Sequence, residues 1–331
     1  MEFFAGVKSA IILPLRTRSA HAKRIFEIDL LRGVMIILMV LDHIAYDFGF
    51  LGPDLFDMVG APQWLASFSS WCTQYWNFSW RVNMRYTILA LFFALSGLSA
   101  YLSRNSLKRG LILIGFGAII SVVFYCLSLI LETNMFIFFG IISSFGVALI
   151  AYSSLRWLVV KATGKRGAWK WFALFFAALF LICGYWMRVS ISSRSMTSDN
   201  WWVIINSGYR EIIPTFHIVD GIFTPIHFGA GTKLAIILGQ LWYGVDWSGI
   251  FPYIGYVFLG GFIGETAYAK KKSIVIDDGS AHVAGVGRTI EKIFRPLTYV
   301  GSKTLYVYLF HQIVVGAATI LVFLLAGLAF K

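Results

Sequence analysis

Residues 27–50, EIDLLRGVMIILMVLDHIAYDFGF, are apolar and numerous enough to cross a lipid bilayer as one helix. The same stretch carries ionisable side chains at Asp29, Arg32, Asp42, His43 and Asp47. Ionisable groups at membrane depth are costly, so they face protein or water rather than lipid and mark functional sites by default. This stretch therefore limits the fold to a helical membrane bundle in which one helix needs partners for a buried polar stripe.

The polar stripe follows one side of the expected helix. Arg32 and His43 are eleven residues apart, which places them about 20° apart around the axis and roughly 16 Å apart along it. Asp29 and Asp47 fall about 60° from Arg32 on one side, and Asp42 falls about 80° from it on the other. The stripe thus leads from one membrane face into the interior of the bundle.

The composition supports a membrane protein. Hydrophobic residues make up 58% of the chain and charged residues 13%, whereas a soluble domain is about half apolar and a quarter charged. The net charge of +12 would suit nucleic-acid binding, but the basic residues cluster at the ends of apolar stretches, as membrane topology requires. Cys72, Cys126 and Cys183 form no disulfide framework or zinc spacing. A nucleic-acid partner and a metal are therefore not expected.

The hydropathy pattern predicts an all-α, polytopic transmembrane bundle with at least seven spans. After residues 27–50, spans are expected at 86–101, 110–131, 135–155, 171–187, 250–267 and 301–330. Basic residues mark the same side of the membrane at every second connection, which places the N-terminus in the cytoplasm. We expect a basic cytoplasmic tail over residues 1–26 and a single transmembrane domain over 27–331.

Two connections on the outer side allow alternatives. Residues 51–85 form an expected loop dense in aromatic side chains, interpreted either as a re-entrant or interfacial helix or as a stacking surface over a substrate entrance. Residues 188–249 form an expected outer cap, and a pair of broken spans is the alternative. His217, Asp220 and His227 occur in this cap with spacings too loose to favour a metal site.

His43 is the leading candidate for chemistry. A neutral imidazole can take a proton from a hydroxyl or amine that attacks a carbonyl, and it titrates near neutral pH. A carboxylate from Asp42, Asp47 or another helix could orient the ring. The alternative is a buried histidine satisfied by a neighbouring helix. The same choice applies to His311 and Gln312 in the last span, where a structural hydrogen bond between helices is the alternative.

The inner end of the stripe suggests an anion site. Asp29 and Arg32 are spaced to pair on one helix face, either as a structural ion pair or as part of a donor site. In the second case Arg32 joins the basic residues of the next inner connection in a mouth that binds a phosphorylated donor. Those residues are Arg104, Lys108 and Arg109.

Several motifs, in order, resemble a known family. The first span resembles the opening of bacterial proteins of the heparan-alpha-glucosaminide N-acetyltransferase catalytic-domain family. It is also similar to acyltransferase-3 proteins, which share an arginine, ten residues and a histidine on their first helix. Further similar blocks are LSGLS at 95–99 with KRG at 108–110, FFGI at 138–141, residues 246–252, and YLFHQ at 308–312. The chain departs at Ser143, where the family usually has histidine, and at Ile313, where it usually has proline.

The resemblance implies a multi-pass acyltransferase of the bacterial cytoplasmic membrane. Its co-substrate would be acetyl-CoA or another acyl-CoA from the cytoplasm, and its acceptor a hydroxyl or amine of a saccharide or glycolipid at the outer side. His43 would match the family's first-helix histidine as general base or acyl carrier, and Arg32 would position the donor's phosphates. The residues themselves add Asp42 and Asp47 as catalytic candidates beside His43, and Asp29 as a donor-site candidate beside Arg32. The matching blocks add expected substrate- or donor-binding residues at Ser96, Ser99, Lys108, Arg109, Tyr308, His311 and Gln312.

Other readings of the same residues remain open. A proton-coupled transporter or flippase would also use intramembrane aspartate and histidine. A catalytically inactive structural homologue is a third reading. Membrane lipids are expected partners, and the residues do not fix an oligomeric state, so a homodimer stays open.

Overall fold

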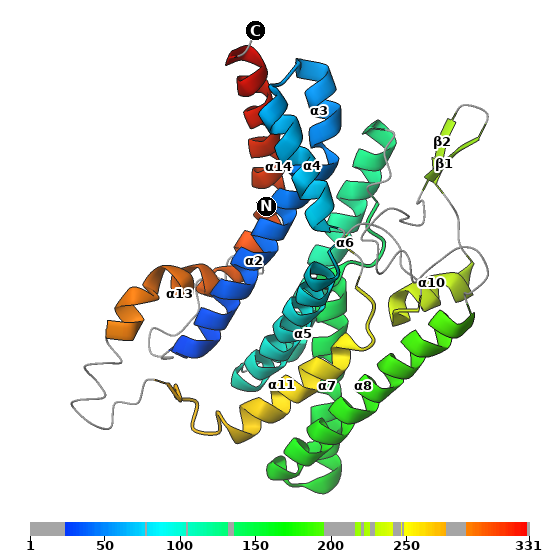
Figure 1. The fold of residues 1–331 in the computed structure, drawn as a ribbon. Coiled ribbons are helices and arrows are strands. Elements are labelled where there is room, and N and C mark those ends of the chain that lie inside the picture. Colours follow the sequence, from blue (N-terminus) through cyan, green and yellow to red (C-terminus); the bar gives the residue numbers. More distant parts are fainter. Residues whose placement is uncertain are drawn as a thin grey trace, which may run out of the picture.

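The computed structural model describes residues 24–76, 78–103, 105–131, 136–194, 216–219, 222–225, 229–240, 246, 248–275 and 289–329, mostly as long helices (Figure 1). The predicted all-α polytopic architecture is confirmed. A two-stranded antiparallel pair, β1 (Phe216–Val219) and β2 (Ile222–Pro225), lies within the expected outer cap. The helices discussed below are α2 (Phe26–Phe50), α3 (Gly52–Val59), α4 (Gln63–Trp76), α5 (Ser79–Leu102), α6 (Ser106–Leu131), α7 (Ile141–Thr163), α8 (Trp169–Arg194), α10 (Ala230–Leu238), α11 (Tyr253–Thr266), α13 (Arg295–Ser302) and α14 (Thr304–Ala329).

Within the described ranges, five helices are long and apolar enough to cross a membrane, namely α5, α6, α7, α8 and α14. Helices α2 and α3 meet the same test as a pair bent by 47°, which gives up to six spans. The span expected at 250–267 corresponds to α11, whose 14 residues are fewer than the ~20 that a crossing needs. The count of at least seven spans stays a prediction, as does the division into a tail and one domain.

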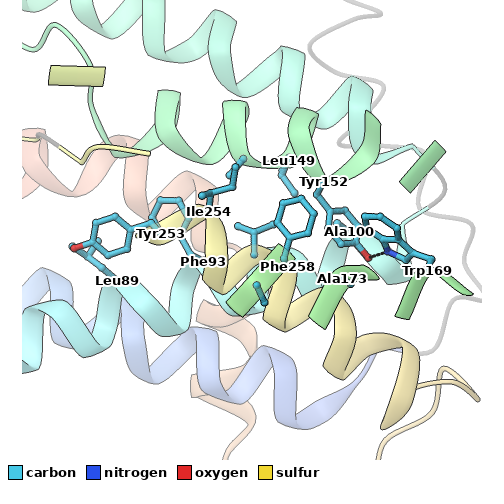
Figure 2. Close-up of a cluster of buried hydrophobic side chains, with 13 residues drawn as sticks. Leu89, Phe93, Ala100, Leu149, Tyr152, Trp169, Ala173, Tyr253, Ile254 and Phe258 are labelled. Atoms are coloured by element: carbon cyan, nitrogen blue, oxygen red, sulfur yellow. Dashed lines mark hydrogen bonds between the residues drawn. The ribbon is translucent and has the colours of Figure 1, made fainter. Parts of the chain in front are cut away.

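The helices form two groups (Figure 1). In the first group, α5, α7, α8 and α11 enclose an aromatic core, drawn in Figure 2. Phe93, Tyr152, Trp169 and Phe258 are each at most 1% exposed. The Trp169 indole donates a hydrogen bond of 3.2 Å to the Tyr152 hydroxyl, so the polar atoms of two buried rings satisfy one another. The four helices therefore pack around one shared core.

Glycines allow α5 and α11 to cross closely. A Cβ atom at Gly97 would lie 1.8 Å from the carbonyl oxygen of Val257, and one at Gly260 would lie 1.8 Å from that of Ala94. Small residues at helix interfaces permit this approach in membranes, where packing rather than the hydrophobic effect holds helices together.

The second group contains α2, α3, α4, α13 and α14. Helix α4 runs back along α2, and its Ser69 and Thr73 hydroxyls donate to the carbonyls of Phe48 and Gly49 at 2.7 and 2.9 Å. Helix α13 packs against the first half of α2, where a Cβ atom at Gly33 would meet the Leu297 carbonyl at 2.0 Å. Helix α14 therefore lies beside the second half of α2, and the two helices share the polar stripe.

The two groups meet at the start of α2 and again at Asp42, whose carboxylate binds Arg81 of α5. Ile28 of α2 packs in one cluster with Leu95 and Leu98 of α5. The buried Glu27 carboxylate accepts hydrogen bonds from the Ser273 hydroxyl at 2.6 Å and the Ile274 N–H at 2.7 Å. The polar stripe thus lies where the groups come together.

The expected outer connection over 51–85 is helical. It folds into α3, α4 and the first turns of α5, which begins at Ser79 rather than near residue 86. Of the two interpretations of this segment, the helical one fits α3 and α4. The expected start of the span at residue 86 left Arg81 outside the helix, but Arg81 is 1% exposed and paired with Asp42, so the helix continues through it.

Candidate functional site

Two histidines from different helices meet at the centre of the polar stripe. His43 of α2 and His311 of α14 have ring centroids 4.7 Å apart and planes at 88°. His43 Nδ1 donates to the Met39 carbonyl at 2.8 Å, and His311 Nδ1 donates to the Tyr308 carbonyl at 2.6 Å. Because a carbonyl only accepts, both protons are fixed on Nδ1, and in the neutral rings Nε2 is the basic nitrogen.

A buried carboxylate lies one turn beyond His43. Asp47 is 0% exposed, and its Oδ1 accepts a hydrogen bond of 2.8 Å from Gln312 Nε2. Among the described residues, Asp47 Oδ2, Gln312 Oε1 and His311 Nε2 are buried without a hydrogen-bond partner. Unsatisfied buried acceptors are costly in a folded protein and are most common at functional sites. This end of the stripe can therefore accept hydrogen bonds from a ligand.

Asp246 approaches the pair from the first helix group. The Tyr308 hydroxyl donates to both Asp246 carboxylate oxygens, at 3.1 and 3.0 Å, and the Asp246 carbonyl accepts from the Ile141 N–H at the start of α7 at 3.1 Å. Burial raises the pKa of Asp246 to about 6, although the Tyr308 hydroxyl and the charge of Arg85 oppose the rise.

Asp42 has a different environment from Asp47. Its Oδ1 accepts from Arg81 Nε at 2.8 Å and from the Tyr75 hydroxyl at 3.0 Å, while Arg81 Nη2 binds Oδ2. The Arg81 guanidinium lies 3.3 Å from the centroid of the Trp76 ring. The partner of His43 Nδ1 is the Met39 carbonyl, so Asp42 influences His43 by its charge and not by a hydrogen bond.

The first turns of α2 gather the expected donor-binding residues. Arg32 Nη1 bonds Asp29 at 3.1 Å, and its Nη2 donates to the Ser99 hydroxyl of α5. Arg109 Nη1 reaches the Ser99 carbonyl at 3.4 Å, and Arg24 lies 3.7 Å from Asp29. Four residues that were predicted from separate motifs, Asp29, Arg32, Ser99 and Arg109, therefore form one cluster.

The other predicted residues either lie apart from these two clusters or fall outside the part of the chain that the structure describes. Ser96 is half-buried on α5, and Lys108 is exposed on the first turn of α6. Arg104, Asp220, His227 and the side chain of His217 lie outside the described residues. In the described part of the chain, no group of three histidine, cysteine or acidic side chains could hold a metal ion.

Sequence reasoning missed Arg81, Arg85 and Asp246 as members of the site. Arg81 and Arg85 are one helical turn apart and so lie on one face of a helix. This spacing indicates that α5 begins before residue 86. Asp246 opens one of the family-like blocks, residues 246–252, but its partner Tyr308 is 62 residues away, so spacing does not indicate that the two side chains meet.

The sequence profile described as "Heparan-alpha-glucosaminide N-acetyltransferase, catalytic" matches residues 62–313. No curated protein and no solved structure matches the chain. The matched residues include Asp246, Tyr308, His311 and Gln312, whereas α2 with His43 precedes them. The match indicates a membrane acetyltransferase of the class that acts on saccharides, and because it covers most of the chain, the protein belongs to the heparan-alpha-glucosaminide N-acetyltransferase catalytic family.

Proposed function

We propose that the protein transfers an acyl group, normally acetyl, from cytoplasmic acyl-CoA to a hydroxyl or amine of a saccharide or glycolipid outside the cytoplasmic membrane of a bacterium. The pair of His43 and His311 carries the proposal. Each ring is tied through Nδ1 to a carbonyl of its own helix, which leaves Nε2 as a base. A positioned base of this kind is what an acceptor hydroxyl or amine needs when it attacks a thioester.

The proposed step uses His43 Nε2 as the general base. It takes the proton of the acceptor hydroxyl or amine while that oxygen or nitrogen bonds to the acyl carbon. The carbon–sulfur bond to CoA breaks, and CoA leaves as a thiolate that takes up a proton. Asp47, held through one oxygen by Gln312, keeps its second oxygen to accept a hydrogen bond from the acceptor. A transient acyl group on His43 would use the same nitrogen.

The cluster around Arg32 supports the placement of the donor. A guanidinium that is held by a carboxylate and a hydroxyl is oriented for phosphate oxygens, and Arg109 lies beside it. The rise per residue puts Arg32 roughly 16 Å from His43 along α2, so a donor with its phosphates at one end and its thioester at the other would bridge them.

Contacts among basic helix ends support the proposed orientation of the protein in the membrane, in which the start of α2 faces the cytoplasm. The Tyr101 ring, at the end of α5, lies 5.7 Å from the Arg156 guanidinium of α7 and 5.6 Å from Lys271 after α11. Arg156 also pairs with Glu265 at 3.1 Å. These contacts bring the basic ends of α7 and α11 beside the end of α5, and the positive-inside rule favours the cytoplasm for that end. In the proposed orientation the start of α2 also faces the cytoplasm.

The test incubates the purified full chain with labelled acetyl-CoA, with and without candidate saccharides. We expect CoA release that depends on the acceptor, and a fall of about 10²–10⁴-fold in His43→Ala, the range of general-base catalysis. Unchanged release in His43→Ala would refute the proposed base. Arg32→Ala should weaken acetyl-CoA binding, whereas Lys165→Ala, an exposed lysine beyond the end of α7, is the control for loss of charge alone.

A further inference from the structure

Helix α4 presents one row of aromatic rings away from the bundle. Trp64, Phe68, Trp71 and Tyr75 recur at helical spacing, and we call this row the aromatic face of α4. Trp64, Phe68 and Trp71 are 55%, 39% and 54% exposed, and Tyr75 is half-buried. The opposite face of α4 is buried against α2 and α14 through Leu65, Ser69, Cys72 and Trp76. Phe68 also contacts Phe48 of α2, with ring centroids 5.1 Å apart, whereas Trp64 and Trp71 are each more than half exposed.

Three of these rings form a row in which each ring stacks on the next. Phe68 and Trp71 have centroids 6.0 Å apart at 18°, and Trp71 and Tyr75 have centroids 6.0 Å apart at 23°. At its far end the Tyr75 hydroxyl bonds Asp42, the residue before His43. The row thus ends at Asp42, which precedes His43 on α2.

The side chains around the rings indicate what can cover them. Helix α4 contains no charged residue, and its exposed surface interleaves the rings with Gln63, Ser67, Ser70 and Gln74. Exposed amides and hydroxyls are costly against hydrocarbon. Interfacial helices that bind anionic headgroups are rich in lysine and arginine. The neighbouring α3 exposes the carboxylates of Asp54 and Asp57, which also disfavours lipid and anionic ligands here.

We propose that the aromatic face of α4 binds an uncharged carbohydrate chain of the acceptor by stacking sugar rings on Trp64, Phe68 and Trp71. Sugar rings have apolar faces that fit aromatic rings and hydroxyl edges that bond glutamine and serine. The proposal rests on the proposed function, and it makes the acceptor an oligosaccharide or a glycolipid with several sugars rather than a single sugar.

Binding to the detergent-purified chain tests the proposal without acyl transfer. The probes are maltopentaose, cellopentaose and N-acetylchitopentaose, each measured by calorimetry beside its monosaccharide. At least one pentasaccharide should bind tenfold or more tightly than its monosaccharide. Trp71→Ala should weaken the binding of that pentasaccharide about two- to twelvefold, as expected for one stacking contact. The affinity for the monosaccharide should stay unchanged. Alanine keeps the helix, so loss of folding does not explain the result.

Trp157→Ala is the matched control. Trp157 is 60% exposed on α7, against 54% for Trp71 on α4. Equal weakening in both variants, or no preference for any pentasaccharide, would overturn the proposal. So would a Trp71→Ala variant that alters only partition into phospholipid nanodiscs, because that result assigns the face to headgroups. Pentasaccharide binding without CoA release would refute the proposed function and leave the binding surface intact.

Discussion

The imidazole rings of His43 and His311 meet edge to face, with centroids 4.7 Å apart and planes at 88°. Each ring is oriented by a carbonyl three or four residues earlier in its own helix, so α2 and α14 each set one ring and their packing sets the pair. Two buried imidazoles at this distance do not both carry a charge, because the charges would repel. The pair therefore carries at most one positive charge, and its two members act as a unit.

This relationship predicts that the effects of the two histidines on catalysis are not additive. His43→Ala should lower kcat/KM by about 10²–10⁴-fold, and His311→Ala by a smaller factor of about tenfold. The double variant should be no slower than His43→Ala, because His311 then has no base to support. A double-mutant cycle on CoA release measures this. Multiplied losses would show that the histidines act independently.

The ion pair of Asp42 and Arg81 predicts a large effect on stability. Arg81 is 1% exposed, so Asp42→Ala would leave a buried guanidinium without its carboxylate and cost about 3–5 kcal/mol of unfolding free energy. Removing both charges, in Asp42→Leu with Arg81→Met, should restore most of this loss. Denaturant unfolding in detergent measures both. Asp54→Ala, at an exposed carboxylate of α3, is the control, and an equal loss there would contradict the argument.

Sequence reasoning found the elements of the site better than their contacts. Arg32, His43 and Asp47 were predictable, because ionisable residues in one apolar stretch share a helix face. The pairing of His43 with His311 was not, since helical spacing carries no information on which spans pack together. Arg81 was misplaced for a related reason, because its burial depends on Asp42, which precedes it by 39 residues. The same limit hid the contact between Asp246 and Tyr308.

Asp246 predicts a pH dependence of stability. Burial raises its pKa from 3.8 to about 6, so between these values the unfolded chain loses a proton that the folded chain keeps. Its contribution is therefore fully present below about pH 4 and is lost as the pH rises through about 6. Asp246→Asn should remove this fall from the unfolding free energy measured between pH 4 and pH 7. Tyr308→Phe removes the hydrogen bond that favours the carboxylate, so it should move the fall to higher pH. An Asp246→Asn profile parallel to that of the native chain would contradict this assignment.

The crossing of α5 and α11 predicts which glycines tolerate alanine. A Cβ atom at Gly97 would lie 1.8 Å from the Val257 carbonyl oxygen, and backbone cannot yield as a flexible side chain does. Gly97→Ala should force the helices apart and cost more than about 2 kcal/mol, in the range of severe overpacking. Gly115 on α6 has nothing within 4 Å of its Cβ position, so Gly115→Ala should be neutral or raise stability by up to about 1 kcal/mol through helix propensity. Thermal unfolding of the two variants in the same detergent compares them directly. Equal stability of the two variants would mean that α5 and α11 do not pack through Gly97. The packing of these two helices around the aromatic core would then differ from that in the structure.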